Sequence, residues 1–205
     1  MNRTFLTVVA VALFALSASA EAGLITVPDP SFEIPVLAYG KYKDIASSTY
    51  YGPWECVSGD AWIDYGYWRA NGYPEDLYAH SGNNKAYGYE DYIYQTLDET
   101  FIEGVTYTLS VWAGQPWMDE AKGWRLYFTT EDHTVELAVA NGEAGLSWGQ
   151  LSLQYTATAA DAGKKIGIKM YGDESVSFDD VTVIPEPATL GLLGLGALML
   201  RRKRS

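Results

Sequence analysis

The stretch Val105–Trp112 constrains the fold of this chain more than any other feature. Every second residue in it is apolar or aromatic, and most residues between them carry a hydroxyl group. A period of two places the apolar side chains on one face of a β-strand, whereas a helix would need a period of 3.6. The stretch therefore predicts a half-buried strand.

The sequence after this stretch repeats the same kind of pattern. Gly, Asn and Asp residues of the sort that favour turns separate the segments at 131–132, 141–142, 161–163 and 172–173. The predicted strands are 125–130, 134–140, 150–158, 165–171 and 176–183. Only 158–163 suggests a helical turn. Short strands at this spacing predict an all-β sandwich or barrel in one domain.

The two ends of the chain do not belong to that domain. Met1-Asn2-Arg3 is positively charged, an apolar stretch follows, and Ala18-Ser19-Ala20 or Ala20-Glu21-Ala22 offers a small-residue cleavage site. Residues 1–22 are therefore predicted to be a secretory signal peptide. The domain is predicted to span 23–183.

The C-terminal segment 184–205 has three parts. Pro185, Glu186 and Pro187 precede an apolar run up to Leu200, and four of the last five residues are basic. As a helix, the apolar run would extend about 20 Å, which is short against a bilayer core of about 30 Å. The basic end would stay cytoplasmic.

This segment resembles the PEP-CTERM sorting signal of exopolysaccharide-producing Gram-negative bacteria. The resemblance implies transient membrane association through a C-terminal transmembrane helix, cleavage by an exosortase-type membrane protease, and delivery to the cell surface or extracellular matrix. The predicted sorting motif is Pro185, Glu186 and Pro187.

Charge and cysteine content restrict the function further. The net charge of −12 would repel nucleic acid and anionic lipid, so neither is an expected partner. Cys56 is the single cysteine of an exported chain, so no internal disulfide can form. It is expected either to be buried as a small apolar residue or to form an intermolecular bridge.

Four segments of the domain resemble the galactose-binding-like jelly roll of many carbohydrate-binding modules. They are Pro30–Glu33, Ile93–Leu97, Gly104–Val111 and Val176–Val181. The resemblance implies a jelly-roll β-sandwich. It also implies a structural calcium held by Glu33 with Asp179 or Asp180, which would join the first strand to the last; the alternative is that these acids are solvated at strand ends.

Aromatic residues are concentrated between Tyr50 and Tyr94, which contains ten tyrosines and three tryptophans among Gly, Asn and Asp. Aromatic rings can stack on the C–H faces of sugars while polar neighbours bind the hydroxyl groups. A layer packed over the edge of the sandwich, or a protein-binding patch, would give the same composition. The candidate glycan-binding residues are Trp62, Tyr65, Tyr67, Trp68 and Tyr73, with Trp117 and Trp124 as further candidates for the same groove.

Catalytic motifs are weak, and no catalytic residue is assigned. Gly145–Gly149 matches the pattern of a nucleophile elbow, but a predicted strand follows it, and both histidines, His80 and His133, precede Ser147. The histidines lack zinc-site spacing. Paired acids for glycoside hydrolysis would need a separation of about 5–9.5 Å; Glu131, Asp132 and Glu136 are expected to be solvated.

The sequence therefore favours an exported, non-catalytic glycan-binding protein in an exopolysaccharide context. A structural matrix or biofilm protein without specific sugar binding is the first alternative, and a polysaccharide-active enzyme is the second. The only expected cofactor is the structural calcium.

Overall fold

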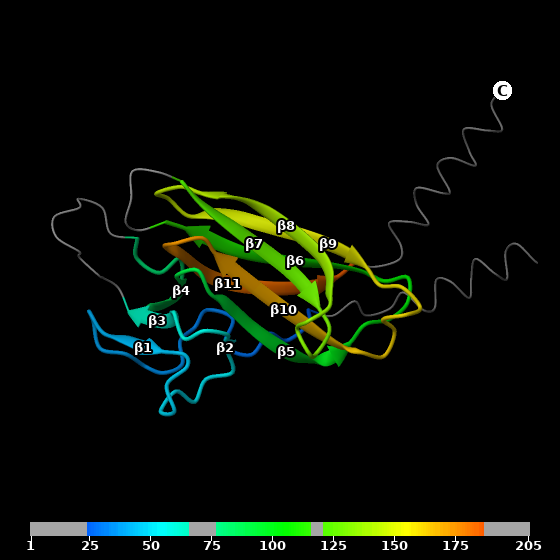
Figure 1. Ribbon diagram of the computed structural model, residues 1–205, viewed down its shortest axis with the longest axis horizontal. Coiled ribbons are helices and arrows are strands. Elements are labelled where there is room, and N and C mark those ends of the chain that lie inside the picture. The colour runs from blue at the N-terminus through cyan, green and yellow to red at the C-terminus, as the bar shows by residue number, and fades with distance from the viewer. Residues whose placement is uncertain (1–23, 66–76, 116–120, 187–205) are drawn as a thin grey trace, which may run out of the picture.

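The structure is a computed structural model that describes residues 24–65, 77–115 and 121–186. The predicted signal peptide and the apolar part of the sorting tail lie outside these ranges. Within them, the regular structure consists of β-strands (Figure 1). The described residues contain no helix with the length and apolar character needed to cross a membrane.

The strands form two antiparallel sheets that pack face to face. The six-stranded sheet has the order β1-β3-β4-β11-β6-β9, and the five-stranded sheet has the order β2-β5-β10-β7-β8. Their bounds are β1 Tyr42–Asp44, β2 Glu55–Cys56, β3 Ala61–Tyr65, β4 Asn84–Gly88, β5 Tyr92–Thr100, β6 Thr106–Gly114, β7 Lys122–Thr129, β8 Glu136–Ala144, β9 Gly149–Thr156, β10 Lys165–Gly172 and β11 Val176–Pro185. The predicted β-sandwich is thereby confirmed.

The core lies between the two sheets and follows the period of two. In β6, Leu109 and Val111 are fully buried, and the alternate residues face outward. Strand β10 contributes Ile166, Ile168 and Met170 from the other sheet, all fully buried. Burial of such side chains contributes about 1.5–3 kcal/mol each, so this alternation fixes the register of every strand that faces the core.

The chain passes repeatedly between the two layers. From β4 onward, each connection leads to the other sheet, except that β8 follows β7 within the five-stranded sheet. Near the start of the described residues, Ile25 forms an isolated bridge with Val183 of β11. The beginning and the end of the domain therefore meet at one strand.

One predicted turn is wrong. Asn141 and Gly142 lie inside β8, where they pair with Arg125 and Trp124 of β7. The indole of Trp124 covers Gly142 so closely that an added Cβ would lie 2.6 Å from the ring. This glycine therefore makes room for a cross-strand aromatic ring and does not form a turn.

The helical turn suggested at 158–163 is present as a hydrogen-bonded turn. The Ala162 amide donates to the Thr158 carbonyl at 3.2 Å, and Gly163 follows with a φ of 82°. A positive φ of this kind strains residues that have a Cβ, so glycine ends the turn without steric strain.

Candidate functional site

Of the predicted glycan-binding residues, Trp62, Tyr65 and Trp124 lie in the described part of the chain, and these three do not form one site. Tyr67, Trp68, Tyr73 and Trp117 lie outside the described residues. Trp62 and Tyr65 are half-buried on β3. Trp62 stacks on Tyr87 with ring centroids 4.5 Å apart, and Tyr65 meets the edge of Tyr39 at 5.8 Å. Both therefore belong to an aromatic cluster on the β1–β3 edge of the six-stranded sheet.

The placement of Trp124 in a binding groove is wrong. Its side chain is 8% exposed and belongs to the hydrophobic core between the sheets. Trp124 lies on the same face of β7 as Leu126 and Phe128, which are both fully buried. The period of two in β7 turns this ring inward.

The opposite face of the same strands carries the strongest candidate site. We call its six side chains the tyrosine face: Tyr92, Tyr94, Arg125, Tyr127, Lys169 and Tyr171. They come from three adjacent strands of the five-stranded sheet, β5, β10 and β7. The register brings them into two rows across the sheet.

Each row has one residue of β10 at its centre. Tyr171 pairs with Tyr92 on one side and with Arg125 on the other, while Lys169 pairs in the same way with Tyr94 and Tyr127. The Tyr92 and Tyr171 rings lie 4.7 Å apart, and the Tyr92 and Tyr127 rings lie 6.0 Å apart. Ring contacts of Tyr92 therefore connect the two rows, although the Tyr127 ring itself is only 3% exposed.

Lys169 fixes the centre of this surface. Its ammonium group lies 4.5 Å from the centroid of Tyr92 and 4.6 Å from that of Tyr127. It also donates to Glu136 Oε1 at 3.1 Å. Cation–π contacts and a partly buried ion pair offset the cost of covering a lysine that is only 7% exposed. The two rings are thereby held in one orientation.

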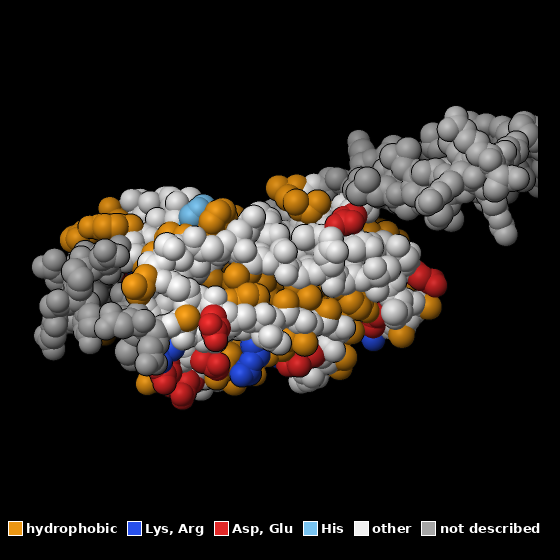
Figure 2. All heavy atoms as spheres, turned by 90° about the horizontal axis from the view of Figure 1, so that it is seen from above, with side chains coloured by type: hydrophobic (Ala, Val, Ile, Leu, Met, Phe, Trp, Pro, Cys, Tyr) orange, Lys and Arg blue, Asp and Glu red, His pale blue; other side chains and the backbone are white. Residues whose placement is uncertain are grey.

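Arg125 contacts a tyrosine ring in the same way in the row that contains Tyr92 and Tyr171. Its guanidinium carbon lies 4.8 Å from the centroid of Tyr171, and one of its nitrogens lies 3.6 Å from Asp173. Acidic and basic side chains lie close together along one long side of the molecule in Figure 2. Paired charges of this kind partly cancel each other's field at the tyrosine face.

A turn at residues 130–134 closes one side of the tyrosine face. The His133 ring packs against Tyr94 with centroids 4.5 Å apart and an interplanar angle of 49°, and its two ring nitrogens lie 3.0 Å from the hydroxyls of Thr96 and Thr129. Gly167 lies beneath this turn, where a Cβ would collide with Thr129 and Thr130. Burial lowers the pKa of His133, so the ring is neutral at neutral pH.

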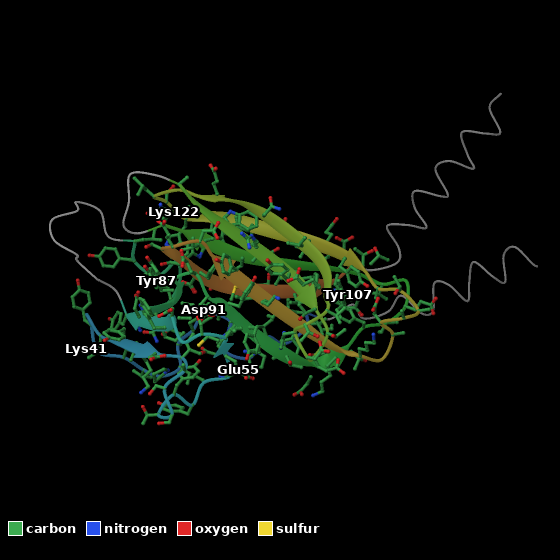
Figure 3. All side chains as sticks on the ribbon, viewed as in Figure 1. Lys41, Glu55, Tyr87, Asp91, Tyr107 and Lys122 are labelled. Atoms are coloured by element: carbon green, nitrogen blue, oxygen red, sulfur yellow. The ribbon has the colours of Figure 1, made fainter. Side chains whose placement is uncertain are left out.

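The other end of the face adjoins β2. The Tyr94 hydroxyl donates to Glu55 Oε2 at 3.4 Å. Asp91, at the start of β5, accepts hydrogen bonds from the backbone amides of residues 57–60 and so holds the loop after β2 against the sheet. Figure 3 shows the labelled Glu55 and Asp91 at this end of the molecule.

The hydroxyls of Tyr94, Tyr127 and Tyr171 remain protonated at neutral pH. Burial raises the pKa of Tyr127 to about 12, and burial likewise raises the pKa values of Tyr94 and Tyr171. Each hydroxyl can therefore donate as well as accept a hydrogen bond at neutral pH.

The acids expected to hold calcium converge on residues 80–84. Glu33 Oε1 accepts from the amides of Asn83 and Asn84 at 2.8 and 2.9 Å. Asp179 Oδ2 accepts from the amides of His80 and Ser81 at 2.7 and 3.0 Å. The first strand region, this loop and the last strand are therefore linked through carboxylates.

The two aspartates differ in protonation. Burial raises the pKa of Asp179 to about 7. Burial acts in the same direction on Asp180, but hydrogen bonds from Ser31, Ser81 and His80 outweigh it and hold the pKa of Asp180 below its ordinary value. Neighbouring carboxyl groups with opposite shifts suit separate acid and base roles.

The contacts leave the calcium prediction open. Glu33, Asp179 and Asp180 meet the same loop, and their charge suits a cation. Among the described residues, however, no group of three or more His, Cys, Asp and Glu side chains is arranged to hold a metal ion. N–H and O–H donors satisfy several of the carboxylate oxygens, so calcium stays a prediction.

An apolar cavity of about 410 Å³ lies beside Asp180. It is formed where the N-terminal segment meets β11, and its walls include Leu24, Ile25, Val27, Pro30 and Val181. Its size and apolar walls suit a small organic molecule.

The remaining sequence motifs do not form catalytic sites. Gly149 begins β9, so a strand and not a helix follows Ser147, and the nucleophile elbow is not formed. Cys56 is half-buried in β2, and burial together with Asp91 raises its pKa to about 11. Its thiol is therefore a poor nucleophile at neutral pH.

Solved structures of other proteins resemble this chain at low sequence identity. The tandem CBM22-1–CBM22-2 domain of Paenibacillus barcinonensis Xyn10C is 13% identical, with a TM-score of 0.51 over 82% of this chain and 46% of that one. The CBM22-1–GH10 modules of Clostridium thermocellum Xyn10B are 20% identical, with a TM-score of 0.45 over 65% of this chain. This chain covers 26% of the Xyn10B chain. The first likeness supports the jelly-roll fold.

Two family models match the sequence, whereas no curated protein does. The PEP-CTERM protein-sorting motif matches residues 183–204, as predicted, and marks an exported protein that is processed at the membrane. The HpiC1-like model, described as HpiC1 cyclase, matches residues 23–184, which include the whole predicted domain. The chain therefore belongs to the HpiC1-like family.

Proposed function

We propose that this exported protein binds glycans through the tyrosine face, without catalysis, at the cell surface or in an exopolysaccharide matrix. The observation that carries this proposal is the convergence of four tyrosines and two cations from three adjacent strands on one outer sheet face. A sheet face that contacts only solvent does not require so many aromatic rings held in fixed positions.

The chemistry of the face suits sugars. Aromatic rings present apolar planes to the C–H faces of pyranoses, and protonated tyrosine hydroxyls can exchange hydrogen bonds with sugar hydroxyls. Tyr92, Tyr94 and Tyr171 are half-buried, so part of each ring reaches solvent. Lys169 and Arg125 hold the rings in place before binding, which reduces the entropy lost on association.

The comparisons support this proposal indirectly. The Xyn10B modules were solved with xylohexaose, and a further neighbour, TmCBM61, was solved with β-1,4-galactotriose. TmCBM61 is 14% identical with a TM-score of 0.47 over 79% of this chain and 99% of that one. Such distant likenesses do not specify a sugar, so the proposal rests on the tyrosine face itself.

The test replaces half-buried members of the face. Tyr94→Ala and Tyr171→Ala should each weaken retention on polysaccharide several-fold, since stacking on an aromatic ring contributes on the order of 1 kcal/mol. Tyr51→Ala is the matched control, because Tyr51 is 75% exposed and outside the face. Affinity electrophoresis against neutral and acidic polysaccharides, with thermal unfolding alongside, provides the readout. Equal retention of all three variants would overturn the proposal and favour a structural matrix role.

A second candidate function is an acid-catalysed reaction of a small apolar substrate. Two observations favour it: the family model is described as a cyclase, and Asp179 has a pKa raised to about 7 by burial. Its neighbour Asp180 lines the apolar cavity of about 410 Å³. Asp179 is fully buried and does not line the cavity, so in this role it would give a proton to the substrate, and later take one back, by way of Asp180.

The protonation of Asp179 discriminates between the two candidates. Carboxyl ¹³C chemical shifts should locate its pKa near 7 if it serves as an acid, and Asp179→Asn should remove that titration. A measured pKa below 4 would exclude Asp179 as a general acid at neutral pH. Glycan retention by Asp179→Asn should match the wild type if binding occurs on the tyrosine face.

A further inference from the structure

The six-stranded sheet has an outer face of a different character. We call it the β6–β9 face. Four cross-strand pairs face outward between these strands: Thr106 with Thr156, Thr108 with Gln154, Ser110 with Ser152, and Trp112 with Gln150. The alternate residues, including Leu109, Val111 and Leu153, are buried in the core.

None of these eight side chains is charged, although the whole chain has a net charge of −12. Their hydroxyl and amide groups can both donate and accept hydrogen bonds. Gln150, Ser152 and Gln154 are exposed, so the β9 side of the face is open to solvent. An uncharged surface of this kind matches a neutral, hydroxyl-rich partner.

An ordered aromatic group lies at one end of the face. His80 stacks on Trp112 with ring centroids 3.9 Å apart and an interplanar angle of 16°, and it meets Trp148 edge-on at 5.9 Å. Trp148 Nε1 donates to the carbonyl of Tyr78 at 2.8 Å, while His80 Nδ1 lies 2.6 Å from Asp180. Both tryptophans are half-buried, so they remain partly open to a ligand.

The carboxylate of Glu186 contacts the other end of the β6–β9 face. Glu186 Oε1 accepts from Thr108 Oγ1 at 2.9 Å and from Gln154 Nε2 at 2.6 Å. The uncharged part next to the tryptophans therefore consists of the Ser110–Ser152 and Trp112–Gln150 pairs. This combination of an aromatic platform with a row of hydroxyl and amide groups is the chemistry that recognises a sugar chain.

The β6–β9 face and the tyrosine face cannot belong to one groove. They are the outer faces of different sheets, and the hydrophobic core lies between those sheets. Figure 1 shows β7 and β10 in one layer and β6 and β11 in the other. A single polysaccharide chain lying straight across one face would not reach the other.

We propose that the β6–β9 face is a second binding surface for a neutral polysaccharide, so that one domain joins two polysaccharide chains. The class of ligand rests on the proposed glycan-binding function, but the location rests on independent residues. Two sites on opposite faces make the domain bivalent, and bivalent binders form networks when each chain offers many sites.

The experiment counts binding sites on the mature protein. Isothermal titration with xylohexaose, cellohexaose and mannohexaose should give two sites per chain for a sugar that binds. Trp148→Ala and Ser152→Arg should each leave one site, and so should Tyr171→Ala. Wild-type protein should make a solution of the polysaccharide built from the bound sugar turbid. Each variant that has lost one of the two faces should not.

Ser152→Arg guards against a folding artefact, because it places a long side chain at an exposed position without removing a packed ring. One site in the wild type that only Tyr171→Ala removes would overturn this inference and leave the proposed function intact. Failure to bind any polysaccharide would overturn both. A dimer in sedimentation that Ser152→Arg dissociates would assign the face to a second copy of the chain and also overturn the inference.

Discussion

The position of a residue in the alternating pattern of its strand decides whether its side chain faces the core or the outside. Trp124 is the clearest case. Trp124 and Arg125 are neighbours in β7, yet one ring is packed between the sheets and the other side chain covers Tyr171 on the tyrosine face. Composition alone would rank the tryptophan as the better sugar platform. The alternation of β7 reverses that ranking.

Trp124→Ala should therefore affect stability and not glycan binding. Removal of a buried aromatic ring leaves a cavity that costs about 3–5 kcal/mol, and urea unfolding should detect this loss. Trp124→Phe is the control, because it retains most of the buried ring. Glycan retention that falls while unfolding is unchanged would contradict the assignment of Trp124 to the core.

His133 should make stability depend on pH. Its pKa is lowered from 6.5, first by burial, so the unfolded chain binds a proton more readily than the native protein. Stability should therefore fall as the pH decreases through about 6.5 and continue to fall down to the lower native pKa. Above this range the contribution is fully present.

The measurement compares the thermal midpoint at pH 7.5 and pH 5 for the wild type and His133→Asn. Asparagine tolerates the φ of 56° at this position, and it does not titrate. The wild type should lose more stability on acidification than the variant. Equal losses would show that His133 is not the group responsible.

At the scale of elements, the period of two predicts strands well where one face is buried. The predicted strand 176–183 corresponds to β11, Val176–Pro185, and 165–171 corresponds to β10, Lys165–Gly172. The strands β1 to β4 were not predicted from the period of two. Two of them have three residues or fewer, and tyrosine and glycine interrupt the apolar pattern.

The tyrosine face could have been anticipated only in part. Tyr92 and Tyr94 alternate with the buried Ile93, and Lys169 and Tyr171 alternate with Ile168 and Met170. Each strand thus signals which of its side chains face outward. The order β5-β10-β7, which brings these strands together, depends on long-range pairing that a single sequence does not reveal.

The calcium proposal belongs to this scale, because it concerns how the N-terminal segment is joined to β11. If calcium binds Glu33 with Asp179 or Asp180, chelation should lower the thermal midpoint, since a ligand bound only by the native state stabilises it by mass action. Glu33→Gln should abolish the response. An identical midpoint with and without chelator would mean that the observed N–H and O–H donors suffice.

At the scale of the whole molecule, the sorting motif is continuous with the folded domain. Pro185 ends β11, and the Glu186 amide donates to the Thr106 carbonyl at 2.6 Å. The Glu186 carboxylate is held by Thr108 and Gln154. The described part of the domain therefore includes the first two residues of the motif, and in the sequence the apolar run follows after Pro187.

This continuity leads to a prediction about sorting. The apolar run after Pro187 is short for a membrane span and ends in basic residues, so we expect brief membrane retention followed by removal of the tail. Mass spectrometry of the surface-exposed protein should detect peptides of β10 and β11 but none that covers Leu190–Leu200. A membrane fraction from the same cells controls for peptide detection. Because the strands of the core end before the apolar run, the released domain should unfold at the same temperature as the full chain; recovery of the intact tail on the surface-exposed protein would contradict cleavage while leaving export in place.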